Sequence, residues 1–319
     1  MVVQSKIIRF LHSYFHFQLK GIIFKFLKEK YQKMTLSELK KIFSQELSKL
    51  YSSGENSEIF TIVAQKILDL DRFQLRVNGD QNISERKENQ FQEILIALKT
   101  GKPFQQILGE TEFYGLKFFV NEHVLIPRPE TEELLELAIK KVRVSGFEVR
   151  DKGPLKILDI GTGSGIIPIV LKKHFPNAAI SAIDFSEDAL KMAKKNVDFH
   201  EVEIEFIHQD YLNGNLTEKY DVIISNPPYI GMEEEVGIAD SVKEFEPKMA
   251  LFSPTSNALI FYEKIAEDCK NHLAENGLVF LEINQKLGQE TRELFVNVLS
   301  EVELLKDISG NERFVWGRK

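Results

Sequence analysis

The sequence predicts an α/β fold with a mostly parallel sheet covered by helices on both faces, preceded by a small helical domain and a connecting β-hairpin. Three observations lead to this fold class. From residue 155 onward, short apolar segments alternate with helical patterns, which is typical of a parallel sheet. Residues 35–100 show helical periodicity. The 319 residues, 43% of them hydrophobic, are enough for a large core or for two domains.

The first 33 residues differ from the rest of the chain. They contain seven Lys or Arg residues and one Glu, in a stretch rich in aromatic and apolar side chains. We expect residues 1–33 to be a leader or non-native extension before a start at Met34; an interfacial amphipathic helix is the alternative. Thr35 and Glu38 have the spacing of a capping box, which favours a helix starting just after Met34.

The next segments follow in order. Residues 34–106 are predicted to form a helical domain, with a helix stop at Gly101 and Pro103. Residues 107–127 are predicted to be a hairpin linker, with Gly115 near the turn. The last domain, residues 128–319, opens with the helix of "PRPETEELLELAIKKV", whose first turn is acidic.

Seven strands are predicted in this last domain. Two short ones lie near the C-terminus, and the other five are "LKILDI", "AISAIDF", "EIEFIHQD", "YDVIISN" and "LVFLEI". Helical patterns separate most of them, including "SGIIPIVLKKHF", "SEDALKMAKKNVDFH" and "ALIFYEKIAEDCKNHLAENG". We therefore expect helices on both faces of the sheet.

Composition limits the classes of function. The net charge of -7 argues against a general nucleic-acid binder. A single cysteine, Cys269, allows no internal disulfide, so we expect a cytoplasmic protein, with Cys269 in the core rather than acting as a nucleophile. Charges at Lys20 and Lys25 interrupt the apolar N-terminal stretch, so no membrane span is expected. The histidines are scattered, and we expect no metal site.

A glycine-rich loop follows the first strand of the sheet. The strand ends at Asp159, and Gly161, Gly163 and Gly165 come directly after it. Glycines permit a tight turn and close approach of a ligand to a helix N-terminus. A dinucleotide is the default ligand for such a loop, but the spacing here is G-x-G-x-G rather than G-x-G-x-x-G.

Two further sites follow the next strands. Asp184 can accept both hydroxyls of an adenosyl ribose; the alternative is that it caps the helix beginning at Ser186. Asp210 and Tyr211 are predicted to meet the adenine base, with plain loop residues as the alternative.

The fourth strand, residues 221–225, runs into "NPPY", Asn226 to Tyr229. Proline cannot donate to a sheet ladder, so strand pairing ends there. A strand-terminating turn with an Asn cap would explain Asn-Pro alone. The whole motif, beside a glycine-rich loop where α/β proteins bind ligands, favours a functional turn.

In "DIGTGSG", Asp184 and "NPPY", the chain resembles class I S-adenosylmethionine-dependent methyltransferases with a Rossmann-like sheet. With "ILGETEFYGLKFFVNEHVLIPRPETE" and "DISGNERFVWGR", it is similar to the PrmC/HemK family. The resemblance implies methyl transfer to the glutamine of the Gly-Gly-Gln motif of class I peptide chain release factors, which modulates translation termination. S-adenosylmethionine is then the cofactor and S-adenosylhomocysteine the product. The implied cofactor-binding residues are Asp159, Gly161, Thr162, Gly163, Ser164, Gly165, Asp184, Tyr211 and Asn226.

The reaction suggests roles for the turn. The side-chain oxygen of Asn226 and the carbonyl of Pro227 can hold the two hydrogens of a glutamine amide, while Tyr229 packs on its plane. We predict that Asn226, Pro227 and Tyr229 are catalytic and that Pro228 and Arg128 also bind substrate. Arg128 is expected to brace the site through an acid, with a surface salt bridge as the alternative. No His or Glu is needed as a base.

Two other functions are compatible with parts of this pattern: a DNA adenine or rRNA guanine N-methyltransferase, and a non-catalytic S-adenosylmethionine-binding module. The acidic charge argues against the first and the intact "NPPY" against the second. We expect a monomer without stable nucleic-acid binding. The chain departs from the family pattern at residues 253–256 and at Asn284, which we expect to lie in loops outside the cofactor core.

Overall fold

The computed structural model describes residues 34–147, 153–230 and 244–319, and the predicted leader, residues 1–33, lies outside them. The described chain forms two compact units, one ending at Gly101 and one running from Lys102 to Lys319. The short helix after Pro103 packs with the hairpin that follows it. No helix among the described residues is both long and apolar enough to cross a membrane.

The first unit is helical. The predicted capping box is present, since Thr35 Oγ1 accepts from the Glu38 N–H while the Glu38 carboxylate accepts from the Thr35 N–H. Three rings, those of Phe43, Phe60 and Phe91, meet in its core with centroids 5.2–6.0 Å apart. The helices are α2 (Leu36–Glu46), α3 (Ser53–Leu68), α4 (Arg72–Val77) and α5 (Glu85–Leu98).

The second unit begins with helix α6 (Phe104–Leu108) and the predicted hairpin. Strands β1 (Glu110–Phe113) and β2 (Leu116–Phe119) pair antiparallel across Tyr114 and Gly115. Both turn residues have positive φ, 54° and 66°, which suits the twist of a tight two-residue hairpin.

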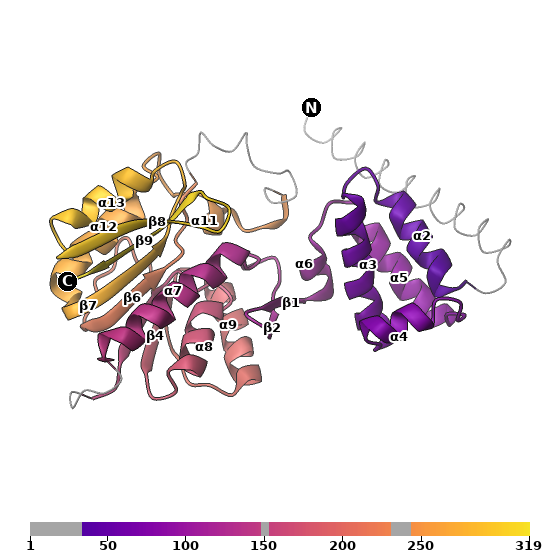
Figure 1. Ribbon diagram of the computed structural model, residues 1–319, viewed down its shortest axis with the longest axis horizontal. Helices are drawn as coiled ribbons and strands as arrows, with labels where there is room; N and C mark the ends of the chain where they lie inside the picture. Colours follow the sequence, from indigo (N-terminus) through magenta and orange to yellow (C-terminus); the bar gives the residue numbers. More distant parts are fainter. Residues whose placement is uncertain (1–33, 148–152, 231–243) are drawn as a thin grey trace, which may run out of the picture. The chain divides into compact units, whose positions relative to one another are not determined.

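Seven strands form one sheet in the order β5-β4-β3-β6-β7-β9-β8 (Figure 1). The first five are parallel, and β9 pairs antiparallel with both β7 and β8. This confirms the predicted mostly parallel, Rossmann-like sheet. The strands are β3 (Lys156–Ile160), β4 (Ala179–Asp184), β5 (Glu205–His208), β6 (Tyr220–Ser225), β7 (Leu273–Glu282), β8 (Glu301–Lys306) and β9 (Glu312–Arg318).

Helices cover both faces of this sheet, as predicted (Figure 1). Along β3, Ile157 packs with α7 and α8 on one face, while Leu158 packs with α12 and α13 on the other. Cys269 is buried on the second face, as expected, and burial raises the pKa of its thiol to about 12. The helices of this unit after α6 are α7 (Pro129–Ser145), α8 (Ile166–His174), α9 (Glu187–His200), α11 (Lys248–Leu251), α12 (Ile260–His272) and α13 (Gly288–Val296).

Candidate active site

The register of the parallel strands brings the predicted site segments to one edge of the sheet. Ile160, the last residue of β3, pairs with Ile183 of β4 on one side and with Ser225 of β6 on the other. Ser225 pairs in turn with Leu281 of β7. The strand order reverses between β3 and β6, and ligands of open α/β sheets bind at this kind of switch point.

The glycine-rich loop leaves β3 in a conformation that glycine favours. Gly161 and Gly163 have φ of 76° and 56°, and a Cβ built on either would find no atom within 4 Å. The N–H groups of Gly161 and Thr162 donate to the Ile183 carbonyl at 2.9 and 3.0 Å, which anchors the loop to β4. Open space therefore lies beside the two glycines, where the backbone is accessible to a ligand.

Helix α9 supports this loop from the other side. A Cβ on Gly165 would lie 3.1 Å from the Cβ of Ala193, so the glycine permits close packing of α9 on the loop. The buried side chain of Asn196 donates to the carbonyls of Ser164 and Phe119 at 2.8 and 2.9 Å and accepts from the Phe119 N–H. Asn196 thus fastens the loop to the hairpin, a role that sequence analysis missed.

Asp159 is fully buried at the end of β3, and no described residue donates a well-formed hydrogen bond to either carboxylate oxygen. Burial, assisted by the charge of Asp184, raises its pKa to about 7, although the nearby Thr162 hydroxyl opposes the shift. An unpaired acid in this position is suited to a ligand that is cationic or carries hydrogen-bond donors.

Replacing Asp159 with asparagine is expected to stabilise the ligand-free protein more at pH 8 than at pH 5. Between its ordinary value of 3.8 and the folded value of about 7, the folded state binds more protons than the unfolded state, so stability falls as pH rises. One pKa unit corresponds to about 1.4 kcal/mol, so the difference should reach a few kcal/mol. Thermal unfolding of both proteins at both pH values measures it, and a gain independent of pH would contradict the raised pKa.

Asp184 is bound to the glycine-rich loop by its carboxylate. One oxygen accepts from the Gly163 N–H and the other from the Ser186 N–H, both at 2.8 Å. Burial raises its pKa, and these backbone hydrogen bonds oppose the shift. The helix cap that sequence analysis offered as the alternative is made by Ser186, whose hydroxyl accepts from the Ala189 N–H. Asp184 therefore holds the loop and keeps further acceptor capacity on its two oxygens.

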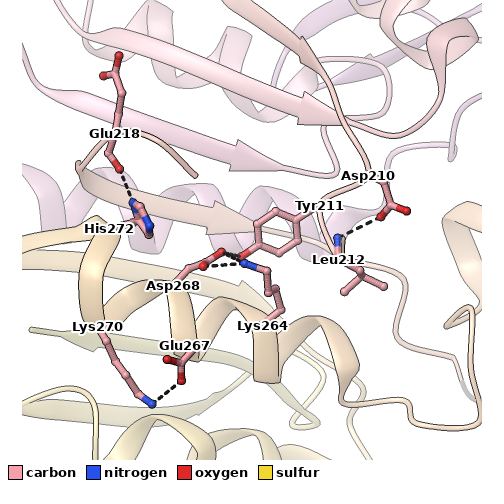
Figure 2. A network of polar contacts seen from close by, with 9 residues as sticks. All are labelled: Asp210, Tyr211, Leu212, Glu218, Lys264, Glu267, Asp268, Lys270 and His272. Carbon is pink, nitrogen blue, oxygen red and sulfur yellow. Dashed lines mark hydrogen bonds and ion pairs between the residues drawn. The ribbon is translucent and has the colours of Figure 1, made fainter. Parts of the chain in front are cut away.

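The structure does not bring the side chain of Tyr211 into this site. Its ring is buried against α12, and its hydroxyl donates to Asp268 at 2.7 Å, as Figure 2 shows. Lys264 binds the same carboxylate at 2.7 and 2.8 Å. The Asp210 side chain points away from the Tyr211 ring and accepts from the Leu212 N–H at 3.1 Å. The Tyr211 ring thus anchors the loop after β5 to the core.

The "NPPY" turn begins directly after the fully buried Ser225, whose hydroxyl donates to the Ile160 carbonyl at 2.7 Å. The Asn226 amide nitrogen donates to Thr131 Oγ1 at 3.2 Å, and Thr131 donates to Glu282 at 2.7 Å. The Tyr229 hydroxyl donates to the other oxygen of Glu282 at 3.3 Å. Asn226 and Tyr229 are therefore both connected to one buried carboxylate.

Sequence analysis did not assign a role to Glu282 or to Thr131. Glu282 ends β7, and burial raises its pKa to about 7, although the Thr131 hydrogen bond and the charge of Arg313 oppose the shift. Acids also lie at the carboxyl ends of two other parallel strands, Asp159 next to the last residue of β3 and Asp184 as the last residue of β4, so an acid ending the apolar run of β7 was a readable signal. Thr131 had no such signal, because only the packing of α7 brings it to β7.

The two departures from the family pattern also lie beside the turn. The Asn284 amide nitrogen donates to the Tyr229 carbonyl at 3.1 Å. Ser253 donates its N–H to the carbonyl of Ile230, the residue after the motif, at 2.9 Å. Ser253 and Asn284 lie in loops, as expected, and these hydrogen bonds support the turn.

Arg128, predicted to contact substrate, forms an ion pair with Glu246 at 2.6 Å. The Glu246 side chain is 1% exposed and the Arg128 side chain 33%, so the acid is buried rather than on the surface. Glu246 also accepts from the Ile126 N–H at 3.1 Å, and Gln106 donates to the Phe245 carbonyl at 2.8 Å. Arg128 therefore braces the segment before α7 against residues 245–246.

Replacing Arg128 with alanine is expected to destabilise the protein by about 1.5–3 kcal/mol, because it leaves the buried Glu246 carboxylate without its charged partner. Glu246→Gln should cost less, since a neutral amide still accepts from Ile126 and needs no counter-charge. Urea unfolding of both variants tests this order. Equal or reversed losses would contradict the unpaired Glu246 charge as the cause of the destabilisation.

Comparison with known proteins identifies the family of the chain. Residues 38–109 match the family model of the PrmC N-terminal domain, and residues 144–243 match that of the methyltransferase small domain. The chain is 43% identical to a release factor glutamine methyltransferase of Flavobacterium psychrophilum over 86% of this chain and 95% of that protein. The proteins of the same name from Streptococcus pneumoniae and Bacteroides thetaiotaomicron are 38% and 35% identical, over 87% and 85% of this chain and 97% and 95% of theirs. The chain therefore belongs to the release factor glutamine methyltransferase family.

Proposed function

We propose that this protein transfers a methyl group from S-adenosylmethionine to the side-chain amide nitrogen of the glutamine in the Gly-Gly-Gln motif of peptide chain release factors. The observation that carries this proposal is the Asn226 amide, held at the end of β6 beside the open backbone of the glycine-rich loop. Similarity to release factor glutamine methyltransferases along most of the chain supports the same substrate.

The residues around the loop fit S-adenosylmethionine. Gly161 and Gly163 leave space for a ligand against the backbone, and the unpaired acid Asp159 is suited to a cationic amino-acid portion. Asp184 can accept the ribose hydroxyls in addition to its backbone donors. Bound there, S-adenosylmethionine supplies an electrophilic methyl group attached to a sulfonium sulfur. The backbones of Thr162, Ser164 and Gly165 complete the proposed cofactor site, and the Tyr211 ring is not assigned to it.

The chain's own contribution is orientation of the glutamine amide. An amide nitrogen is a weak nucleophile because its lone pair is delocalised into the carbonyl. Two fixed acceptors, Asn226 Oδ1 and the Pro227 carbonyl, would hold its two hydrogens and stabilise positive charge developing on nitrogen. The proline-rich turn restricts the motion of these acceptors, and Tyr229 would pack on the amide plane. The proton leaves only as methyl transfer makes it acidic, so no dedicated base is required.

We also assign docking of the release factor to the N-terminal helical domain, residues 34–106, with residues 107–127 as its linker to the methyltransferase domain, residues 128–319. The match of residues 38–109 to a domain of the family supports treating this region as part of the enzyme's common architecture.

Methyl transfer from radiolabelled S-adenosylmethionine tests the function. The acceptors are purified release factor, a release factor whose motif glutamine is replaced by alanine, and bulk DNA or rRNA. Label on the intact release factor alone is the expected result. Label on nucleic acid instead would leave the cofactor site in place and assign the nucleic-acid N-methyltransferase activity.

A further inference from the structure

The contacts of Thr131 form the centre of a buried chain of hydrogen bonds. Thr131 is 2% exposed in the first turn of α7 and lies between Asn226 Nδ2, at 3.2 Å, and Glu282 Oε2, at 2.7 Å. The Asn226 side chain makes this one hydrogen bond to the described residues. Thr131 is therefore the group that can decide which end of the Asn226 amide faces the substrate.

The donors and acceptors in this chain of hydrogen bonds determine which group donates at each step. A hydroxyl has one hydrogen, and an ionised carboxylate can only accept, so Thr131 must give its hydrogen to Glu282. Its oxygen is then left as an acceptor, which Asn226 can satisfy only with its amide nitrogen. Asn226 Oδ1 must consequently point away from Thr131. Without the hydroxyl, the two nearly isosteric ends of the amide could exchange places.

The same carboxylate also holds the last residue of the motif. Glu282 Oε1 accepts from the Tyr229 hydroxyl at 3.3 Å, and the main-chain carbonyl of Glu282 accepts from the Tyr262 hydroxyl at 3.1 Å. Asn284 binds the Tyr229 carbonyl at 3.1 Å. Glu282 is therefore positioned to control both side chains to which the reaction assigns substrate contact.

We propose that Thr131 and Glu282 are positioning residues that set the Asn226 amide with its oxygen toward the substrate nitrogen. Neither residue touches the reacting atoms, and both act through Asn226. The inference rests on the proposed function for its substrate and adds two residues that determine how the glutamine is held.

The donor-to-acceptor direction of this chain of hydrogen bonds depends on the ionisation of Glu282. The groups facing it are Thr131 and Glu130 of α7, Arg313 of β9, Tyr229 of the turn and Tyr262 of α12. Burial raises the pKa of Glu282 to about 7, so the carboxylate is ionised above that pH. A protonated Glu282 can donate to Thr131, which frees the Thr131 hydrogen for Asn226 Oδ1 and reverses the amide. Activity should therefore fall as pH decreases through about 7.

A matched set of threonine variants tests the first residue. Thr131→Val keeps the shape of the side chain and removes the hydroxyl, and it should lower kcat on release factor by about 10²-fold, as expected for a misoriented reacting group. Affinity for S-adenosylhomocysteine should stay at the wild-type value. Thr131→Ser restores the hydroxyl and should recover most of the rate. Thr291→Val makes the same change at a fully buried hydroxyl of α13 that has no hydrogen-bond partner in the described part of the chain, and should leave kcat unchanged.

The pH profile tests the second residue. In Glu282→Gln, the loss of kcat below pH 7 should disappear. Adding Thr131→Val to Glu282→Gln should lower kcat by a smaller factor than adding it to the wild type, because both substitutions interrupt the same chain of hydrogen bonds. Wild-type kcat in Thr131→Val, equal losses in Thr131→Val and Thr131→Ser, or an unchanged acid limb in Glu282→Gln would overturn the inference. If wild-type protein methylates nucleic acid instead of release factor, the proposed function fails, and the same variants are compared on that acceptor.

Discussion

Replacing Asn226 with alanine should lower kcat for release factor methylation by about 10²–10³-fold, the usual loss when a preorganised polar group at a reacting centre is removed. The variant loses the acceptor that holds one hydrogen of the substrate amide. Affinity for S-adenosylhomocysteine should change little, because the cofactor cradle is formed mainly by the loop after β3 and by Asp184. Single-turnover methyl transfer at saturating cofactor, with a parallel binding measurement, separates the two effects.

Asn226→Asp tests whether activity requires the correctly oriented side-chain amide or only an acceptor oxygen at this position. Aspartate keeps the acceptor but cannot donate to Thr131, and it places a negative charge next to the Glu282 network. We therefore expect a loss of similar size. Asn213→Ala, at an exposed asparagine on the loop after β5, serves as the control that should retain the wild-type rate. Wild-type turnover in either Asn226 variant would refute the proposed mechanism.

Replacing Asp184 with alanine should weaken binding of S-adenosylhomocysteine by about 10²-fold or more, since each hydrogen bond to a charged group contributes about 1.5–3 kcal/mol. Two effects act together. The ribose loses its acceptor, and the Gly163 and Ser186 N–H groups lose the carboxylate that orders the loop. Calorimetric titration with S-adenosylhomocysteine gives the dissociation constant directly.

Two further variants distinguish weaker binding of S-adenosylhomocysteine from loss of folding. Asp184→Asn keeps an acceptor with almost the same shape and should bind more tightly than the alanine variant. Glu187→Ala removes an acid from the neighbouring helix, where the side chain is 71% exposed, and should bind as the wild type does. If all three variants bind equally well, the Asp184 carboxylate contributes neither a ribose acceptor nor loop order to cofactor binding.

The sequence by itself determined the fold class and the order of the site segments along the chain. Alternating apolar strands and helical patterns predicted the parallel sheet, because burial on both faces requires that pattern. The glycines after β3, the acid ending β4 and the motif ending β6 could be assigned to one edge, since the carboxyl ends of parallel strands meet there.

Only the tertiary structure decided which side chains hold these segments. Thr131 and Asn226 are 95 positions apart, and Thr131 and Glu282 are 151 apart, so local periodicity contains no information about their contact. The same is true of Arg128 with Glu246 and of Tyr211 with Asp268. Strand and helix periods specify the face on which a residue lies within its own element. The partner on that face depends on how α7 and α12 pack on the sheet, and this packing is a property of the whole core.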